Sequence, residues 1–323
     1  MTGASCEGAA QLVSRSRAGA VCDSAPVSYQ LTVLAPVATV LAPAPAPPGW
    51  RALRDAIGLP DVRIVSAEPP DDGWPAGGLQ LCRARRSTRN TEIVWDAGKL
   101  TITIRALASP DDCDLALRVA EGAARLAGAA TVEADYFGAV DLADLRRLHT
   151  ADWMHEQAVS GARALATLIR DGRGPLAMPG PQRSCWIGAR LLAELEAAGP
   201  AAAFADRVLE TMRRVQWDIP AGFRDAGVFA SGGRGNGDGP GRETRFAVWL
   251  GDENLVIPCV DYVALRVAEG EIVMVPFGAV AALAGTRGTL LDECQLLVRA
   301  MGDDDWAELV ARARPLAASP PRK

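Results

Sequence analysis

Alternating apolar and polar positions predict strands in the first part of the chain. Five runs are rich in β-favouring residues, and in them apolar and polar side chains largely alternate. They are residues 28–36, 62–68, 79–85, 91–96 and 99–107. A short helix is expected over residues 49–59, and a further strand over 131–136. Residues 27–137 are therefore expected to form an α+β domain of ferredoxin-like character.

A helix is predicted after Ser109, because its start and its end are both marked. Ser109 stands where an N-cap residue belongs, Pro110 suits the first helical position, and three aspartates follow in the first turn. Apolar side chains then recur at helical spacing from Leu115 to Leu126, and Gly128 can close the helix.

Between residues 141 and 217 the apolar residues recur with the period of an α-helix. Three apolar stripes at helical spacing begin at Met154, Ile187 and Phe204. Glycine and proline separate them in residues 171–183 and 197–200, where helices are expected to stop. These patterns predict a central helical segment over residues 138–230.

Residues 231–243 (SGGRGNGDGPGRE) form a glycine-rich run. It matches neither the phosphate-binding P-loop motif nor the dinucleotide fingerprint, and it lies before a strand pattern. Either motif needs a strand that leads into a helix, whose N-terminus meets the phosphate. We therefore expect a flexible linker that joins two folded parts.

The strand pattern returns in residues 244–316. Three apolar runs separated by short turns predict an antiparallel meander, and two short helices are expected after it. The second of these helices would begin at the acidic residues 302–306 (GDDDW). Residues 1–26 and 317–323 carry no periodic pattern and are expected to be flexible tails.

Composition narrows the class of protein. A net charge of −5 gives little attraction to nucleic acid, and nearly all basic residues are arginine, as in proteins from GC-rich bacteria. Seven cysteines without a C-x-x-C pair favour free thiols in a reducing compartment and argue against a zinc ribbon. The uncharged run 24–50 leaves export open, but Pro36 interrupts any membrane helix, so a cytoplasmic location is predicted.

Both histidines of the chain lie in residues 145–157. On one continuous helix His149, Asp152 and Glu156 would share a face, which is a geometry for general acid–base chemistry or for a metal ion. The H-E-x-x-H motif is absent, and the apolar stripe through Met154 puts this face in solvent. The alternative to a functional site is therefore that these side chains are simply exposed to solvent, and no metal or cofactor is assigned.

Cys185 is a second candidate. It would stand at the start of a helix near Trp186, with Arg183 two residues before it, and both features would favour the thiolate. In the alternative interpretation Ser184 caps the helix and Cys185 packs as a small apolar residue.

Four arginines lie between residues 83 and 89, and an anion could bind where such charges gather. The anion-binding candidates are Arg83, Arg85, Arg86 and Arg89, together with Arg183. Alternation along a strand would divide the four, and no aromatic residue interleaves to stack bases, so a solvated hairpin is the expectation.

No assembled catalytic motif stands out, so function is expected to reside in a surface. The leading hypothesis is a non-enzymatic cytoplasmic bacterial protein that binds another protein, as an accessory, chaperone-like or toxin-neutralising factor. The alternative is an enzyme that uses Cys185 or the face of His149, Asp152 and Glu156. Nucleic-acid binding through the arginines ranks last.

Overall fold

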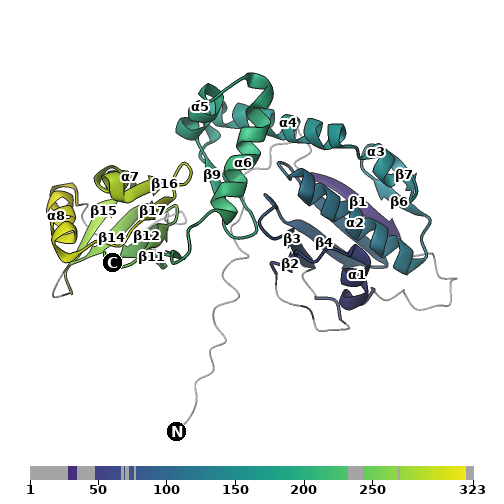
Figure 1. Ribbon diagram of the computed structural model, residues 1–323, viewed down its shortest axis with the longest axis horizontal. Helices are drawn as coiled ribbons and strands as arrows, with labels where there is room; N and C mark the ends of the chain where they lie inside the picture. Colours follow the sequence, from purple (N-terminus) through teal and green to yellow (C-terminus); the bar gives the residue numbers. More distant parts are fainter. Residues whose placement is uncertain are drawn as a thin grey trace, which may run out of the picture.

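The structure is a computed structural model, in which a helical segment lies between two units that contain sheets (Figure 1). It describes residues 28–34, 48–66, 69, 73–75, 78–231, 243–267 and 270–317. The two expected tails therefore lie outside the described residues, apart from residue 317.

The N-terminal unit is a seven-stranded sheet in the order β2-β3-β4-β5-β1-β6-β7. Every neighbouring pair in it is antiparallel. Its strands are β1 (Ser28–Leu34), β2 (Val62–Ile64), β3 (Leu79–Arg83), β4 (Thr91–Asp96), β5 (Lys99–Arg105), β6 (Thr131–Ala134) and β7 (Gly138–Asp141). The α+β class is confirmed, whereas the ferredoxin-like arrangement stays a prediction.

Two helices, α1 (Trp50–Ile57) and α2 (Pro110–Ala127), pack against the apolar face of this sheet. The predicted start and end of α2 are confirmed, because Ser109 caps it in a capping box and Gly128 follows it in the left-handed conformation. Strand β7 pairs with β6, so the sheet extends past residue 137, where the helical segment was expected to begin.

The helical segment holds α3 (Leu145–Leu148), α4 (Ala151–Leu168), a π-helical turn (Ile169–Arg173), α5 (Ala189–Ala197), a 3-10 turn (Ala201–Ala203) and α6 (Phe204–Trp217). Leu165, Leu191 and Val208 lie in its apolar core. A two-stranded ribbon of β8 (Leu176–Met178) and β9 (Cys185–Ile187) separates α4 from α5. Sequence patterns missed this ribbon because each strand is only three residues long.

The C-terminal unit holds two four-stranded sheets and two helices, α7 (Phe277–Leu283) and α8 (Asp303–Ala313), with 3-10 turns η4 (Gly285–Arg287) and η5 (Arg314–Leu316). One sheet contains β10 (Arg224–Asp225), β13 (Leu255–Ile257), β17 (Leu296–Val298) and β16 (Gly288–Leu290). The other contains β11 (Val228–Ser231), β12 (Thr244–Trp249), β14 (Tyr262–Arg266) and β15 (Ile272–Pro276).

The predicted antiparallel meander is wrong. Strand β12 pairs with β14 in parallel, because β13 leaves for the other sheet and the chain returns beside β12 in the same direction. The first of the two expected helices, α7, also comes before β16 and β17. The acidic start of α8 at Asp303 is confirmed.

The glycine-rich segment joins two neighbouring strands. Ser231 at the end of β11 pairs with Thr244 at the start of β12, so both ends of the segment lie in one sheet. It therefore connects strands of a single unit, where a linker between two folded parts was expected. Residues 232–242 themselves lie outside the described residues.

The expectation of free thiols is corrected by a disulfide between Cys259 and Cys294. Their Cα atoms lie 4.9 Å apart although 35 residues separate them in sequence, so spacing along the chain gave no sign of the pair. The free cysteines of the described residues are Cys82, Cys113 and Cys185, and all three are buried.

Candidate functional site

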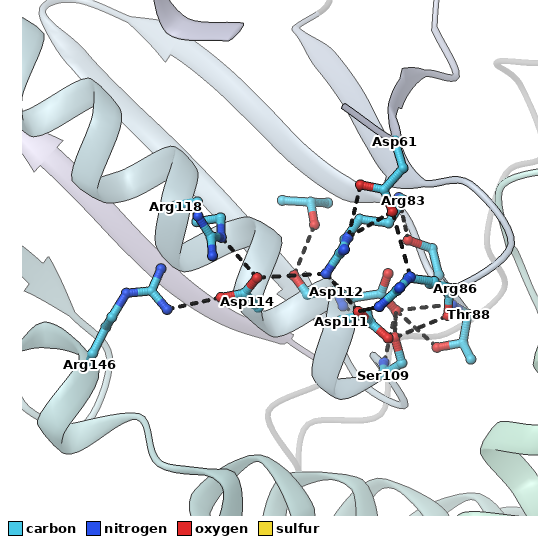
Figure 2. Close-up of polar contacts among 12 residues, drawn as sticks. Asp61, Arg83, Arg86, Thr88, Ser109, Asp111, Asp112, Asp114, Arg118 and Arg146 are labelled. Carbon is cyan, nitrogen blue, oxygen red and sulfur yellow. Dashed lines mark hydrogen bonds and ion pairs between the residues drawn. The ribbon is translucent and has the colours of Figure 1, made fainter. Parts of the chain in front are cut away.

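Two of the anion-binding candidates, Arg83 and Arg86, lie against carboxylates at and beside the start of α2 (Figure 2). Arg83 donates from Nε to Asp61 at 3.2 Å and from Nη1 to Asp111 at 2.6 Å, and Asp114 lies 3.7 Å from Nη1. Arg86 also lies 3.3 Å from Asp111. Because these positive charges face carboxylates at short range, the structure does not support an anion site at Arg83 and Arg86.

Helix α2 extends this ionic network along its surface (Figure 2). Asp114 accepts hydrogen bonds from Arg118 and Arg146, both at 2.9 Å. Burial alone would raise the pKa of Asp114, but these two bonds lower it overall. The network joins β3, α2 and α3, so its role is structural.

Asp112 lies beneath this network and is buried. Its Oδ2 atom accepts from the backbone N–H groups of Thr88, Arg89 and Ser109 at 3.0, 3.1 and 2.8 Å. The hydroxyls of Thr88 and Ser109 donate to the same oxygen. Burial raises the pKa of Asp112, although these hydrogen bonds act to lower it. The carboxyl group therefore holds residues 88–89 against the first turn of α2.

Arg89, Arg85 and Arg183 lie in three different settings. Arg89 is buried, its Nε and Nη1 atoms have no hydrogen-bond partner, and burial together with the charge of Arg105 lowers its pKa to about 10. Arg85 is exposed, while Arg183 forms an ion pair with Asp225 at 3.2 Å. The expected solvated hairpin is wrong for Arg83, which is only 12% exposed in its side chain, and for Arg89.

His149 does not share a helical face with Asp152 and Glu156. It follows α3 as its C-terminal cap, before Thr150 caps α4, and it is buried whereas both acidic side chains are exposed. The predicted exposure of His149 and the predicted shared site are therefore wrong. The helix breaks at residues 149–150, and a continuous helical spacing does not apply across such a break.

The hydrogen bonds of His149 fix its tautomer. Its Nδ1 lies 2.7 Å from the carbonyl oxygen of Leu145, which can only accept, so Nδ1 carries the proton. Nε2 then accepts from the hydroxyl of Tyr29 at 2.6 Å. The rings of Trp153 and Phe137 pack edge-on against the imidazole. Burial lowers the pKa of His149, so the neutral ring serves as a packed link between β1 and α3.

Cys185 lies in β9, and α5 begins only at Ala189 with Gly188 as its N-cap. The predicted helix start at Trp186 and the predicted Ser184 cap are both wrong. Burial, with the nearby charge of Asp292, raises the pKa of the Cys185 thiol. The activated thiolate is therefore contradicted, and the packed thiol of the alternative interpretation fits its full burial.

The described residues offer neither a metal site nor a membrane-spanning helix. They contain no group of three or more histidine, cysteine, aspartate or glutamate side chains that could hold a metal ion. Among the same residues, no helix combines the length and apolar character needed to cross a bilayer.

Strand β11 presents an exposed apolar surface that the sequence patterns did not predict. It is an edge strand, and within the described residues it pairs with β12 alone. Val228 and Phe229 are 38% and 52% exposed, and Phe229 stacks on Phe246 of β12 with ring centroids 5.6 Å apart. The available signal was the uncharged run 226–231 (AGVFAS) directly before the glycine-rich segment.

Comparison with known proteins adds no assignment. No protein-family model, no curated protein and no solved structure matches this chain.

Proposed function

We propose that this protein works by binding an extended segment of another protein along the free edge of β11, as a non-enzymatic accessory, chaperone-like or toxin-neutralising factor in the bacterial cytoplasm. The observation that carries this proposal is the uncharged, largely apolar edge at Val228–Ser231, which no strand besides β12 covers in the part of the chain that the structure describes. Edge strands of this kind invite a further strand, and soluble proteins usually protect them with charge or cover them.

The hydrogen-bond pattern defines which backbone groups are free. Val248 donates to the carbonyl of Gly227 across the ladder, so in this register Phe229 also bonds toward β12. The N–H and C=O groups of the intervening residues, Val228 and Ala230, therefore point away from the sheet. A partner strand would bond to these two residues.

The opposite edge of the same sheet differs. Strand β15 is contacted by α8 and η5, and Arg314 of η5 binds Glu271 beside this strand through two hydrogen bonds. In the other sheet, the edge strand β10 consists of the charged residues Arg224 and Asp225. These features distinguish β11 from β15 and β10 as an edge for strand addition.

The surface also indicates the chemistry of the partner. The partner segment would be extended, with an apolar side chain over the stacked rings of Phe229 and Phe246 and without a charge at that position. Backbone hydrogen bonds would supply part of the affinity, and this apolar contact would supply the preference among sequences.

The test replaces Ala230, whose N–H points outward. Ala230→Pro removes that donor without removing a bond to β12, and Ala230→Ser is the matched control that keeps the donor. In the native host, a photo-crosslinking residue at Val228 should capture a protein that the same residue at Ile272 on β15 does not. Ile272 is a suitable control because it is 60% exposed.

A peptide that spans the captured segment then provides the quantitative measurement. We expect Ala230→Pro to weaken its binding at least about tenfold, roughly the loss of one or two hydrogen bonds, while Ala230→Ser leaves it unchanged. Absence of capture at Val228, equal capture at Ile272, or binding that ignores Ala230→Pro would each reject the proposal.

A further inference from the structure

A short turn, residues 292–295, bridges the helical segment and the C-terminal unit. On one side of it Leu291 packs against the core of the helical segment, and on the other side Leu296 lies within the core of the C-terminal unit. We call residues 292–295 the bridging turn.

The bridging turn bonds mainly to β9 and α5. The carboxylate of Asp292 accepts from the backbone N–H of Trp186 at 2.8 Å, and the N–H of Glu293 donates to the carbonyl of Trp186 at 3.0 Å. The side chain of Gln295 donates to the carbonyl of Ser184 at 2.7 Å. This exchange resembles the pairing of one further short strand with β9.

Glu293 also satisfies the beginning of α5. Its Oε2 atom accepts from the backbone N–H of Leu191 at 2.8 Å, which lies in the first turn of a helix whose N-cap, Gly188, has no side chain. A Cβ atom at Gly188 would lie 2.6 Å from Cδ of Glu293, so glycine is needed for this contact. The bridging turn thus supplies the cap that α5 lacks.

The bridging turn also carries a cross-link. Cys294 forms the disulfide with Cys259, which lies in the loop between β13 and β14. Both cysteines are partly exposed, whereas the three free cysteines of the described residues are buried. A dithiol in solution can therefore reach this disulfide, whereas burial shields the three free thiols from dissolved reagents.

Docking of the bridging turn places the carboxyl group of Asp292 in the interior, with only 1% of the residue exposed. Burial raises the pKa of Asp292 although backbone groups of Trp186, Cys294 and Gln295 donate to it. A buried carboxylate opposes docking of the turn. The disulfide ties the neighbouring Cys294 to the loop between β13 and β14, which limits the conformations open to the bridging turn and so favours the docked one.

We propose that the Cys259–Cys294 disulfide is a redox-sensitive latch: when it is closed it holds the bridging turn against β9 and α5, and when it is reduced the turn releases them. A dithiol supplies two electrons and two protons, its own thiols become a disulfide, and the S–S bond opens to two Cys thiols. This inference rests on the cytoplasmic location proposed above, because the disulfides of cytosolic proteins are usually transient and redox-sensing.

The buried thiol of Cys185 reports release, because β9 lies directly against the bridging turn. The oxidised full-length protein is incubated with dithiothreitol under native conditions, treated with N-ethylmaleimide, and mapped by mass spectrometry. We expect labelling of Cys259 and Cys294 after reduction, together with a rise of at least about tenfold in the labelling rate of Cys185. Cys113 in the core of α2 is the internal control and should stay protected.

A double variant, Cys259→Ser with Cys294→Ser, should label Cys185 at the fast rate with or without dithiothreitol. The latch is rejected if Cys185 is equally protected in the oxidised and reduced protein. It is also rejected if Cys113 becomes reactive to the same extent, which would show general unfolding, or if Cys259 and Cys294 react fully before any reductant is added.

Discussion

Replacement of Asp112, which lies beneath the ionic network of Figure 2, by alanine should loosen the N-terminal unit more than replacement of Asp111 within that network. One carboxylate oxygen accepts from the backbone N–H groups of Thr88, Arg89 and Ser109 in a place where the residue is 1% exposed. Alanine would leave these three donors buried without an acceptor. Each such donor costs about 1–3 kcal/mol, and with relaxation of residues 88–89 we expect a total loss of about 3–5 kcal/mol.

Two further variants separate hydrogen bonding from charge. Asp112→Asn can keep the accepting oxygen, because its amide nitrogen would take the place of Oδ1, which has no hydrogen-bond partner, so we expect a smaller loss than for alanine. Asp111→Ala is the matched control in the same helical turn. The Asp111 carboxylate pairs with Arg83 and Arg86 but is 33% exposed. The stability lost in Asp111→Ala should therefore stay below about 1 kcal/mol.

The measurement is native-state hydrogen exchange of α2 amides, which gives the free energy of opening of this unit alone, without assuming that the whole chain unfolds in one step. A loss for Asp112→Ala below about 1 kcal/mol, or no larger than that for Asp111→Ala, would refute the idea that this carboxyl group organises the start of the helix.

Two other variants test the helical segment and the buried histidine. Leu165→Ala should cost about 2–5 kcal/mol in the opening free energy of α4, because Leu165 is 4% exposed in the core, and a cost below about 1 kcal/mol would show that this face is not packed. Burial lowers the folded-state pKa of His149, so the unfolded chain binds the proton more readily and stability should fall as the pH drops below about 6.5. Urea midpoints at about pH 7 and pH 5 should show this loss in the wild type and a smaller one in His149→Gln, and an equal loss in both proteins would contradict the assignment.

Sequence patterns correctly predicted the features that depend on residues close together in the chain. The caps of α2 are specified by Ser109, Pro110 and Gly128 themselves, and the acidic start of α8 follows from the preference of a helix N-terminus for negative charge. The burial of Leu165 likewise follows from its place in an apolar stripe.

Features that depend on contacts far apart in the sequence were missed. The partner of His149 is Tyr29, 120 residues away, and the cap of α5 comes from Glu293, 102 residues beyond Leu191. Neither contact leaves a periodic pattern. The parallel pairing of β12 with β14 also depends on β13 joining another sheet, which no signal within β12 or β14 can show.

The alternation of strands between the two C-terminal sheets has a consequence for how this part of the chain can be made and divided. Strands β10 and β11 lie before the glycine-rich segment, but their partners β13 and β12 lie after it. A ribosome that has completed residue 231 has therefore produced two strands that cannot yet pair, and they must wait for the following residues. For the same reason proteolysis in the segment need not separate the products, whereas a gene truncated there would yield unpaired strands prone to aggregation.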